Sequence, residues 1–282
     1  MPLLHERLAE ARRTLTAAGI DQDEAAIDVE VLARHVLGWD RGQLVTRLRE
    51  PVPITLEPQF EQLMDRRRAR EPIAYIVGHR EFWGREFEVT PAVLVPRPET
   101  EIIIEEAIEE AGARSFRTIV DVGTGSGCLA VTLALEFPAA RVLATDISPA
   151  ALAVTRRNAG KHSVEARVTC VEGDVLAAID EPADLIVSNP PYVPSGDAGH
   201  LQPEVERYEP PAALFGGTDG LDVIRRLFAT APARLAGGGR LIVEFGFGQE
   251  ADVRGLAGAA GWRVVRIRAD LQGIPRTAVL GR

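Results

Sequence analysis

The chain has 282 residues, of which 46% are hydrophobic and 26% are charged, and this balance is typical of a globular protein. Its formal net charge of −9 argues against a protein that wraps a long nucleic acid by counterion release. No run approaches the roughly 18 apolar residues of a membrane span, and no signal-peptide pattern is present. Its two cysteines, Cys128 and Cys170, are too few for a disulfide framework, so we expect a reduced, cytoplasmic protein.

Residues 1–75 show helical periodicity and no strand pattern. Apolar side chains recur at three- and four-residue spacing from Leu4 to Leu15. A second apolar stripe is formed by Ala25, Ile27, Val31, Leu32 and Val36. Asp21 or Asp23 is placed to cap this second helix, and Gly38 to end it. A third helix is expected from Pro58 to Ala69. We therefore expect a small helical bundle as the N-terminal domain.

The pattern changes to strands after residue 75. Phe82, Phe87 and Val89, with Gly84 between the two phenylalanines, predict a β-hairpin linker over 76–96. The remaining residues, 97–282, alternate strand and helix patterns. Strands are expected at 118–121, 141–145, 167–171, 184–188, 240–245, 263–268 and 277–280, and helices at 128–137, 150–159, 221–235 and 250–260. This alternation predicts an α/β, Rossmann-like domain with a mostly parallel sheet, in which the last strand is antiparallel because only a loop precedes it.

A glycine-rich turn follows the first strand of this sheet. It comprises Gly123, Thr124, Gly125, Ser126 and Gly127, and a helical pattern begins directly after it. Glycines allow a tight turn and a close approach of a ligand to the main chain, and the helix N-terminus adds N–H donors. A dinucleotide fingerprint would require glycine where Cys128 stands, which argues against a nicotinamide oxidoreductase.

Acidic residues follow the next two strands. Asp146 lies 23 residues after Gly123, where a carboxylate can accept both hydroxyls of a ribose. By itself an aspartate in front of Ser148 can also cap a helix, but the glycine turn favours the ribose role. After the third strand, the segment from Gly173 to Val175 is placed to reach an adenine base.

The most informative motif is Asn189-Pro190-Pro191-Tyr192, at the end of the fourth strand. Ligands of open α/β sheets bind at the carboxyl ends of strands. An amide or aromatic amine is a poor, planar nucleophile that must be held in line with the bond it attacks. The Asn189 oxygen can accept one N–H of such a group, a carbonyl of the proline pair can accept the other, and Tyr192 offers a flat face. The competing interpretation is a rigid turn after a buried strand, which the preceding motifs disfavour.

No other chemistry is indicated. The histidines are scattered without metal-ligand spacing, and we expect no metal. The basic run of Arg66, Arg67, Arg68 and Arg70 is better explained as a solvated helix face than as a binding patch.

Together these residues resemble the HemK/PrmC family of release factor glutamine N5-methyltransferases over nearly the whole chain. The segments that carry the resemblance are Glu71–Ile76 with Gly78, Phe82–Phe87, Val93–Glu101, the glycine turn, the Asn-Pro-Pro-Tyr motif, Glu204-Val205, Glu209-Pro210, Gly216–Leu221, Glu244, Gly246, Gln249, Arg276 and Gly281-Arg282. The most specific is Pro96-Arg97-Pro98-Glu99-Thr100-Glu101, because nucleic-acid methyltransferases share the Asn-Pro-Pro-Tyr motif.

The resemblance implies a cofactor, a substrate and a set of contacts. The cofactor would be S-adenosyl-L-methionine, leaving as S-adenosyl-L-homocysteine, and the substrate the Gly-Gly-Gln glutamine of class I peptide-chain release factors, docked in part by the helical domain. Cofactor contacts are implied at Gly123 to Gly127, Asp146, Val175 and Asn189, with Arg97 and Glu99 nearby. Residues Asn189 to Tyr192 would hold the glutamine.

Two rival functions are weighed against this one. A nucleic-acid amino-methyltransferase, acting on adenine N6 or guanine N2, uses the same amine geometry but needs a basic channel for a flipped base. The net charge and the Pro-Arg-Pro-Glu-Thr segment argue against it. A noncatalytic docking protein is disfavoured by the intact Asn-Pro-Pro-Tyr motif.

Overall fold

A computed structural model of the chain describes residues 2–282. The chain divides into two compact units. The first, the helical unit, is formed by Met1–Gly78 together with Gln202–Tyr208, and the second, the catalytic unit, by His79–Leu201 and Glu209–Arg282. A short segment from the second half of the chain therefore belongs to the N-terminal unit, which a division into consecutive domains does not include. Among the described residues, no helix is both long and apolar enough to cross a membrane.

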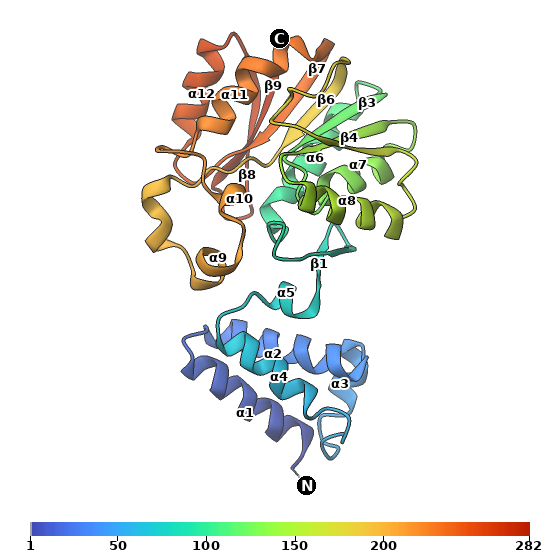
Figure 1. The fold of residues 1–282 in the computed structure, drawn as a ribbon, viewed down its shortest axis with the longest axis vertical. Helices are drawn as coiled ribbons and strands as arrows, with labels where there is room; N and C mark the ends of the chain where they lie inside the picture. Colours follow the sequence, from blue (N-terminus) through green and yellow to red (C-terminus); the bar gives the residue numbers. More distant parts are fainter. Residues whose placement is uncertain (1) are drawn as a thin grey trace. The chain divides into compact units, whose positions relative to one another are not determined.

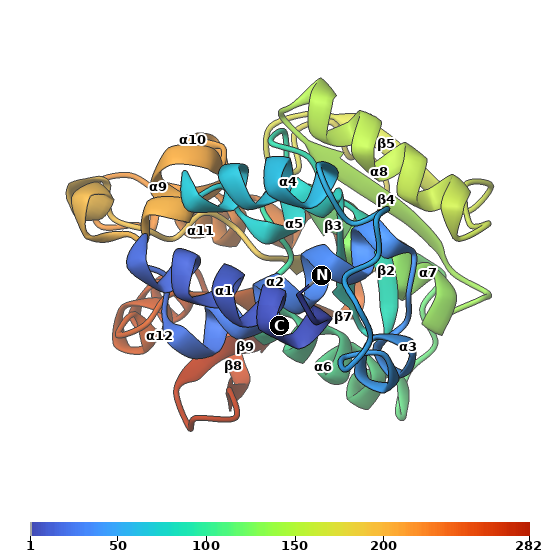
Figure 2. The same ribbon diagram turned by 90° about the horizontal axis from the view of Figure 1, so that it is seen from below.

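The helical unit is built around three helices that pack on one another, α1 (Leu4–Ala17), α2 (Gln22–Leu37) and α4 (Gln59–Arg68) (Figures 1 and 2). Three short helices complete it, α3 (Arg41–Thr46), α5 (Ile73–Val77) and α9 (Pro203–Tyr208). The stripe predicted for the first helix is confirmed, because Leu4, Leu8, Ala11 and Leu15 are all buried. The predicted ends of α2 are confirmed too. Asp21 accepts hydrogen bonds from the amides of Asp23 and Glu24, and Gly38 ends the helix at a φ of 64°.

The stripe predicted for the second helix is partly wrong. Ile27 is 63% exposed, whereas the buried face of α2 contains Asp28 beside Val29 and Leu32. The helix is rotated relative to the purely apolar prediction because Asp28 pairs inside the unit with Arg67, which is 1% exposed. The arginine run is therefore not a uniformly solvated face, and the expectation for Arg67 is wrong.

The catalytic unit begins with the predicted hairpin, in which β1 (His79–Phe82) pairs antiparallel with β2 (Arg85–Glu88). Its sheet contains β3 (Thr118–Val122), β4 (Arg141–Asp146), β5 (Val168–Glu172), β6 (Ala183–Ser188), β7 (Leu235–Glu244), β8 (Arg263–Ala269) and β9 (Pro275–Gly281). The strand order is β5-β4-β3-β6-β7-β9-β8, and β9 is antiparallel to both of its neighbours. The mostly parallel sheet with an antiparallel last strand is thus confirmed.

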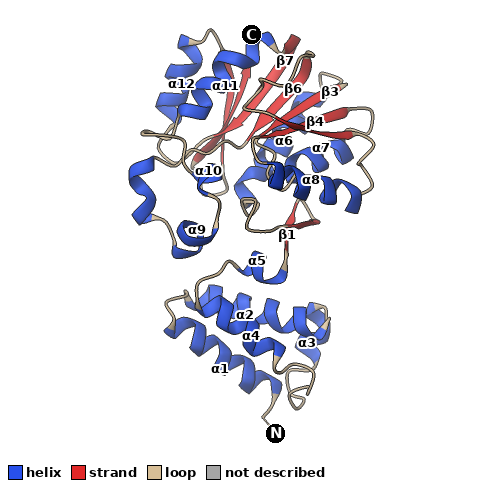
Figure 3. Cartoon of the chain, viewed as in Figure 1, coloured by secondary structure: helices blue, strands red, loops and turns tan. Residues whose placement is uncertain are grey.

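Helices cover both faces of this sheet (Figure 3). One face packs against α6 (Glu101–Ala111), α7 (Cys128–Glu136) and α8 (Pro149–Lys161), and the other against α11 (Asp222–Thr230) and α12 (Glu250–Ala259). Strand residues alternate between the two cores, as Ile119 and Val120 do. The helix predicted over 221–235 is too long. A 3₁₀ turn containing Pro232 follows α11, because proline cannot continue the helical hydrogen bonds. A further short helix, α10 (Pro211–Leu214), precedes α11.

Candidate active site

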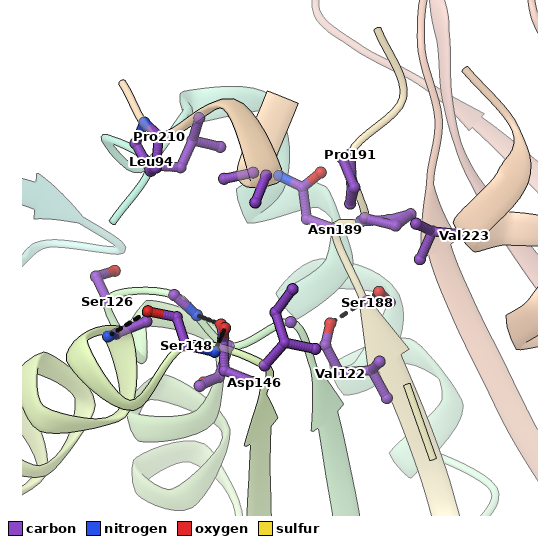
Figure 4. A pocket seen from close by; sticks show the side chains of 18 of the residues that line it. Leu94, Val122, Ser126, Asp146, Ser148, Ser188, Asn189, Pro191, Pro210 and Val223 are labelled. Carbon is purple, nitrogen blue, oxygen red and sulfur yellow. Dashed lines mark hydrogen bonds between the residues drawn. The ribbon is translucent and has the colours of Figure 1, made fainter. Parts of the chain in front are cut away.

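A cavity of about 350 Å³ opens at the carboxyl ends of β3, β4 and β6. Strand β3 lies between β4 and β6, so this is the point where the strand order reverses and where open α/β sheets bind ligands. Figure 4 shows Asn189 and Pro191 on one side of the cavity and Asp146, Ser148 and Val122 across from them. Nine of the eleven residues predicted for the site line it: Gly123, Thr124, Gly125, Ser126, Asp146, Val175, Asn189, Pro190 and Pro191. The other two, Gly127 and Tyr192, are not among the lining residues.

The glycine turn is anchored by hydrogen bonds to Asp121 in β3 and by close packing. Its three glycines have φ values of 72°, 56° and 80°, in the left-handed region that favours glycine. The buried Asp121 carboxylate accepts hydrogen bonds from the Thr124 hydroxyl (2.6 Å) and from the Ala130 amide in α7 (3.1 Å). Gly127 serves packing, since a Cβ there would lie 2.8 Å from the Thr155 methyl group in α8. The turn is therefore anchored to both helices beneath it.

Asp146 ends β4 and faces the cavity. One of its oxygens accepts the Gly125 amide (3.0 Å) and the other accepts the Ser148 amide (2.9 Å). Ser148, and not Asp146, caps α8, because its hydroxyl accepts the Ala151 amide (3.2 Å). The helix-cap interpretation of Asp146 is thus wrong. Each carboxylate oxygen has a second lone pair, so Asp146 can still accept hydroxyl groups of a ligand.

An apolar wall continues from Asp146. Val175, with φ at 55°, is buried, and its carbonyl accepts the Thr145 hydroxyl (3.1 Å). Val122 and Ile147 line the same part of the cavity, as do Gly173 and Asp174. A flat, apolar base with polar edges fits such a slot.

Asn189 belongs to a series of hydrogen bonds that connects it through Thr100 to Glu244. Its side-chain nitrogen donates to the Thr100 hydroxyl (2.9 Å), which donates to a Glu244 oxygen (2.7 Å). The Tyr192 phenol interacts with the same Glu244 carboxyl. Burial raises the pKa of Glu244 to about 7, and burial next to this carboxyl raises the pKa of the Tyr192 phenol. Tyr192 thus turns its hydroxyl toward Glu244.

The carbonyls of the Pro-Pro-Tyr segment are held closely by the backbone around them. A Cβ on Gly216 would lie 2.4 Å from the Pro191 oxygen, so only glycine permits this approach. Gln249 donates to the Tyr192 oxygen (3.0 Å) while accepting the Gly246 amide (2.8 Å). Because the two prolines have no N–H, the peptide units that carry the Asn189 and Pro190 carbonyls offer an acceptor without a donor.

Several lining residues lie outside the motifs that predicted the site. Leu94 and Pro210 come from loops, Thr100 ends a 3₁₀ turn and Phe215 follows α10, and none of these positions can be derived from periodicity. Arg97 lines the cavity as expected and binds the buried Glu209 carboxylate with 2.7 Å contacts, whereas Glu99 is not a lining residue. In the sequence, the specific Pro-Arg-Pro-Glu-Thr segment could have indicated Arg97 and Thr100, and the Glu-Pro pair at 209–210 could have indicated Pro210.

The site has the chemistry of positioning and not of an activated nucleophile. Cys128 lines the cavity, but burial raises the pKa of its thiol to about 12, so it stays protonated at neutral pH. Within residues 2–282, no group of three or more His, Cys, Asp or Glu residues could hold a metal ion. What the cavity offers is a carboxylate for hydroxyls, an apolar slot and an oriented amide.

Comparison with known proteins agrees with this chemistry. Residues 6–78 match the family model described as PrmC N-terminal domain, and residues 100–201 match the methyltransferase small domain. The release factor glutamine methyltransferase of Cereibacter sphaeroides is 46% identical over 96% of each chain. Its namesake from Burkholderia pseudomallei is 44% identical over 96% of this chain and 95% of its own.

The solved structure of ribosomal protein L11 methylase from Lactobacillus delbrueckii subsp. bulgaricus has a TM-score of 0.51 at 21% identity. The match covers 69% of this chain and 83% of that one, and it shows the fold alone. Identity above 40% along almost the whole chain shows more than the fold. The protein is an S-adenosylmethionine-dependent methyltransferase, and it belongs to the release factor glutamine methyltransferase family.

Proposed function

We propose that the protein transfers the methyl group of S-adenosylmethionine to the side-chain nitrogen (N5) of the glutamine in the Gly-Gly-Gln motif of class I peptide-chain release factors. The observation that carries this proposal is the oriented Asn189 amide at the edge of a nucleoside-sized cavity, followed by the donor-free Pro190-Pro191 pair. The names of the full-length relatives support the choice of substrate.

The cavity residues fit the cofactor. Asp146 would accept the ribose hydroxyls, Val122, Ile147 and Val175 would enclose the adenine, and the turn from Gly123 to Gly127 would receive the methionine part through its backbone. The bound cofactor supplies an electrophilic methyl group on a sulfonium, so the protein needs no strong base.

The substrate amide must be held because its lone pair is delocalised. The Asn189 oxygen would accept one N–H of the glutamine and a proline-pair carbonyl the other, aligning the nitrogen with the methyl group. We keep Tyr192 in this set for the flat face of its ring, while its phenol interacts with Glu244. We also propose that the helical unit docks the release factor and that the enzyme acts in the cytoplasm, where release factors work.

The direct test uses labelled S-adenosylmethionine and a purified release factor. A matched factor with its Gly-Gly-Gln glutamine changed to alanine is incubated in parallel, together with duplex DNA and RNA. We expect label on the intact factor alone. Label on nucleic acid would instead support an adenine or guanine amino-methyltransferase, and label on both factors would move the target away from that glutamine.

Asn189→Ala tests the residue that carries the proposal. We expect turnover to fall on the order of 10²–10³-fold, because one positioning hydrogen bond is lost, while cofactor binding stays near that of the wild type. Gln272→Ala, which removes a side-chain amide from the exposed β8–β9 turn, is the matched control. Wild-type turnover in Asn189→Ala would contradict the proposed role. Single-turnover methylation and equilibrium cofactor binding are the two measurements.

A further inference from the structure

We propose that Thr100 and Glu244 are positioning residues that set the direction of the Asn189 side-chain amide, so that its oxygen faces the substrate. The inference rests on the proposed function, since it concerns how the glutamine N–H is received. An asparagine amide has nearly the same shape in its two orientations, which differ by half a turn. Only one orientation offers an acceptor to the glutamine, and the other would set an NH₂ group against an NH₂ group.

The direction of these hydrogen bonds follows from the number of protons that each group can donate. Glu244 accepts the Thr100 hydroxyl (2.7 Å), and in its ionised form, which predominates above its pKa of about 7, it can only accept hydrogen bonds. The single hydroxyl proton of Thr100 is therefore used, and its oxygen can act only as an acceptor toward Asn189. Asn189 must then present its nitrogen to Thr100 (2.9 Å), and its oxygen points elsewhere.

Burial makes this direction hard to reverse. Thr100 is 2% exposed and Glu244 is 1% exposed, so bulk water cannot replace either partner. The three residues come from separate elements, the turn Pro98–Thr100 before α6, the end of β7, and the loop after β6. Glu244 forms no ion pair within the described part of the chain, so the role that its surroundings give it is that of a hydrogen-bond acceptor.

The first test compares Thr100→Val with Thr100→Ser. Valine keeps the shape of threonine but removes the hydroxyl, whereas serine keeps the hydroxyl. We expect Thr100→Val to lower kcat on the order of 10–100-fold, with cofactor Kd and thermal midpoint near those of the wild type. Thr100→Ser should restore most of the turnover. Wild-type kcat in Thr100→Val, or an equal loss in both variants, would overturn the inference, because a pure packing role does not depend on the hydroxyl.

The second test reverses the direction of the hydrogen bonds that link Asn189, Thr100 and Glu244. In Asn189→Asp, an acceptor oxygen faces the acceptor oxygen of Thr100, so we expect poor turnover. Adding Glu244→Gln lets the side-chain amide at position 244 donate to the Thr100 oxygen, which frees the Thr100 proton for the carboxylate introduced by Asn189→Asp. We expect the double variant to be about tenfold more active than Asn189→Asp alone, although Glu244→Gln by itself lowers turnover.

The outcomes separate this inference from the function on which it rests. Additive losses in the double variant would overturn the proposed direction of the hydrogen bonds. Failure of the wild-type enzyme to label the release factor would refute the proposed function instead, because that measurement uses only the wild-type enzyme. A wild-type enzyme that labels the factor, with Thr100→Val equally active, would refute the positioning role alone.

Discussion

Buried carboxylates occur in both units of this protein, but their partners differ. In the helical unit, Arg67 lies among acids, with its Nε atom 2.6 Å from Asp28 and an Nη atom 2.8 Å from Glu204. Arg70 adds a 2.7 Å contact to the other Glu204 oxygen. Burial opposes ionisation of Glu204, yet the hydrogen bonds from the two arginines outweigh it and lower its pKa. Glu204 is thus held as an ion, whereas at Asp28 burial outweighs the Arg67 contacts and raises the pKa.

In the catalytic unit, Asp121 and Glu244 are buried without any ion pair among the described residues. Their partners are neutral donors, the Thr124 hydroxyl and Ala130 amide for the first, and the Thr100 hydroxyl for the second. Burial raises the pKa of each carboxyl to about 7. A buried acid without a cation is costly to ionise, so both residues reduce stability at neutral pH.

The difference separates two uses of the same side chains. The helical unit uses charge to join distant segments, since Asp28, Arg67 and Glu204 lie in α2, α4 and α9. Along the chain, helix α9 lies between the Asn-Pro-Pro-Tyr motif and the cavity residue Pro210. The catalytic unit uses acceptors to orient the glycine turn and Asn189, and tolerates their cost.

Removing the cation should have the largest effect on stability. We expect Arg67→Met to lower the free energy of unfolding by about 3–5 kcal/mol, because Asp28 would be left buried without a partner and Glu204 would keep only Arg70 among the described residues. Urea unfolding followed by far-UV circular dichroism measures the change. Arg68→Met is the matched control, since the neighbouring arginine is half exposed and, among residues 2–282, pairs only with the exposed Asp65. Equal stabilities of the two variants would remove the contrast between the units.

The pH dependence of stability tests the other half of the comparison. A carboxyl with a raised folded-state pKa stabilises the fold most below its unfolded pKa, and this contribution is lost as the pH rises through the folded value. For Glu244, raised from 4.5 to about 7, the loss between pH 4 and pH 8 is about 3 kcal/mol. We therefore expect Glu244→Gln to gain that amount relative to the wild type across this range.

The measurement is urea unfolding of both proteins at several pH values. Glu165→Gln, at an exposed position, is the control and should follow the wild-type curve. A constant difference between Glu244→Gln and the wild type at every pH would show that Glu244 titrates normally, and the carboxyls of the two units would then not differ.

The sequence predicted the elements of the site that depend on local pattern. Parallel strands bring their carboxyl ends to one edge, so the glycine turn, Asp146 and Asn189 could be placed together before any coordinates. The contacts of Thr100 could not, because it bonds to residues 89 and 144 positions away, and such polar pairs have no periodicity. For the same reason, the sequence did not predict the cluster around Arg67 or the membership of residues 202–208 in the helical unit.

Substitutions in helix α2 have the smallest expected effect on stability, and they test directly whether charged contacts or the apolar pattern decide which face of the helix is buried. The apolar pattern placed Ile27 in the core, whereas in the structure the charged cluster turns Asp28 inward and leaves Ile27 63% exposed. We expect Ile27→Ser to change the free energy of unfolding by no more than about 0.5 kcal/mol. Val29→Ala, on the buried face, should cost about 2 kcal/mol because it removes two fully buried methyl groups. If the two costs were reversed, the inner face of α2 would follow the apolar stripe, and Asp28 would not meet Arg67.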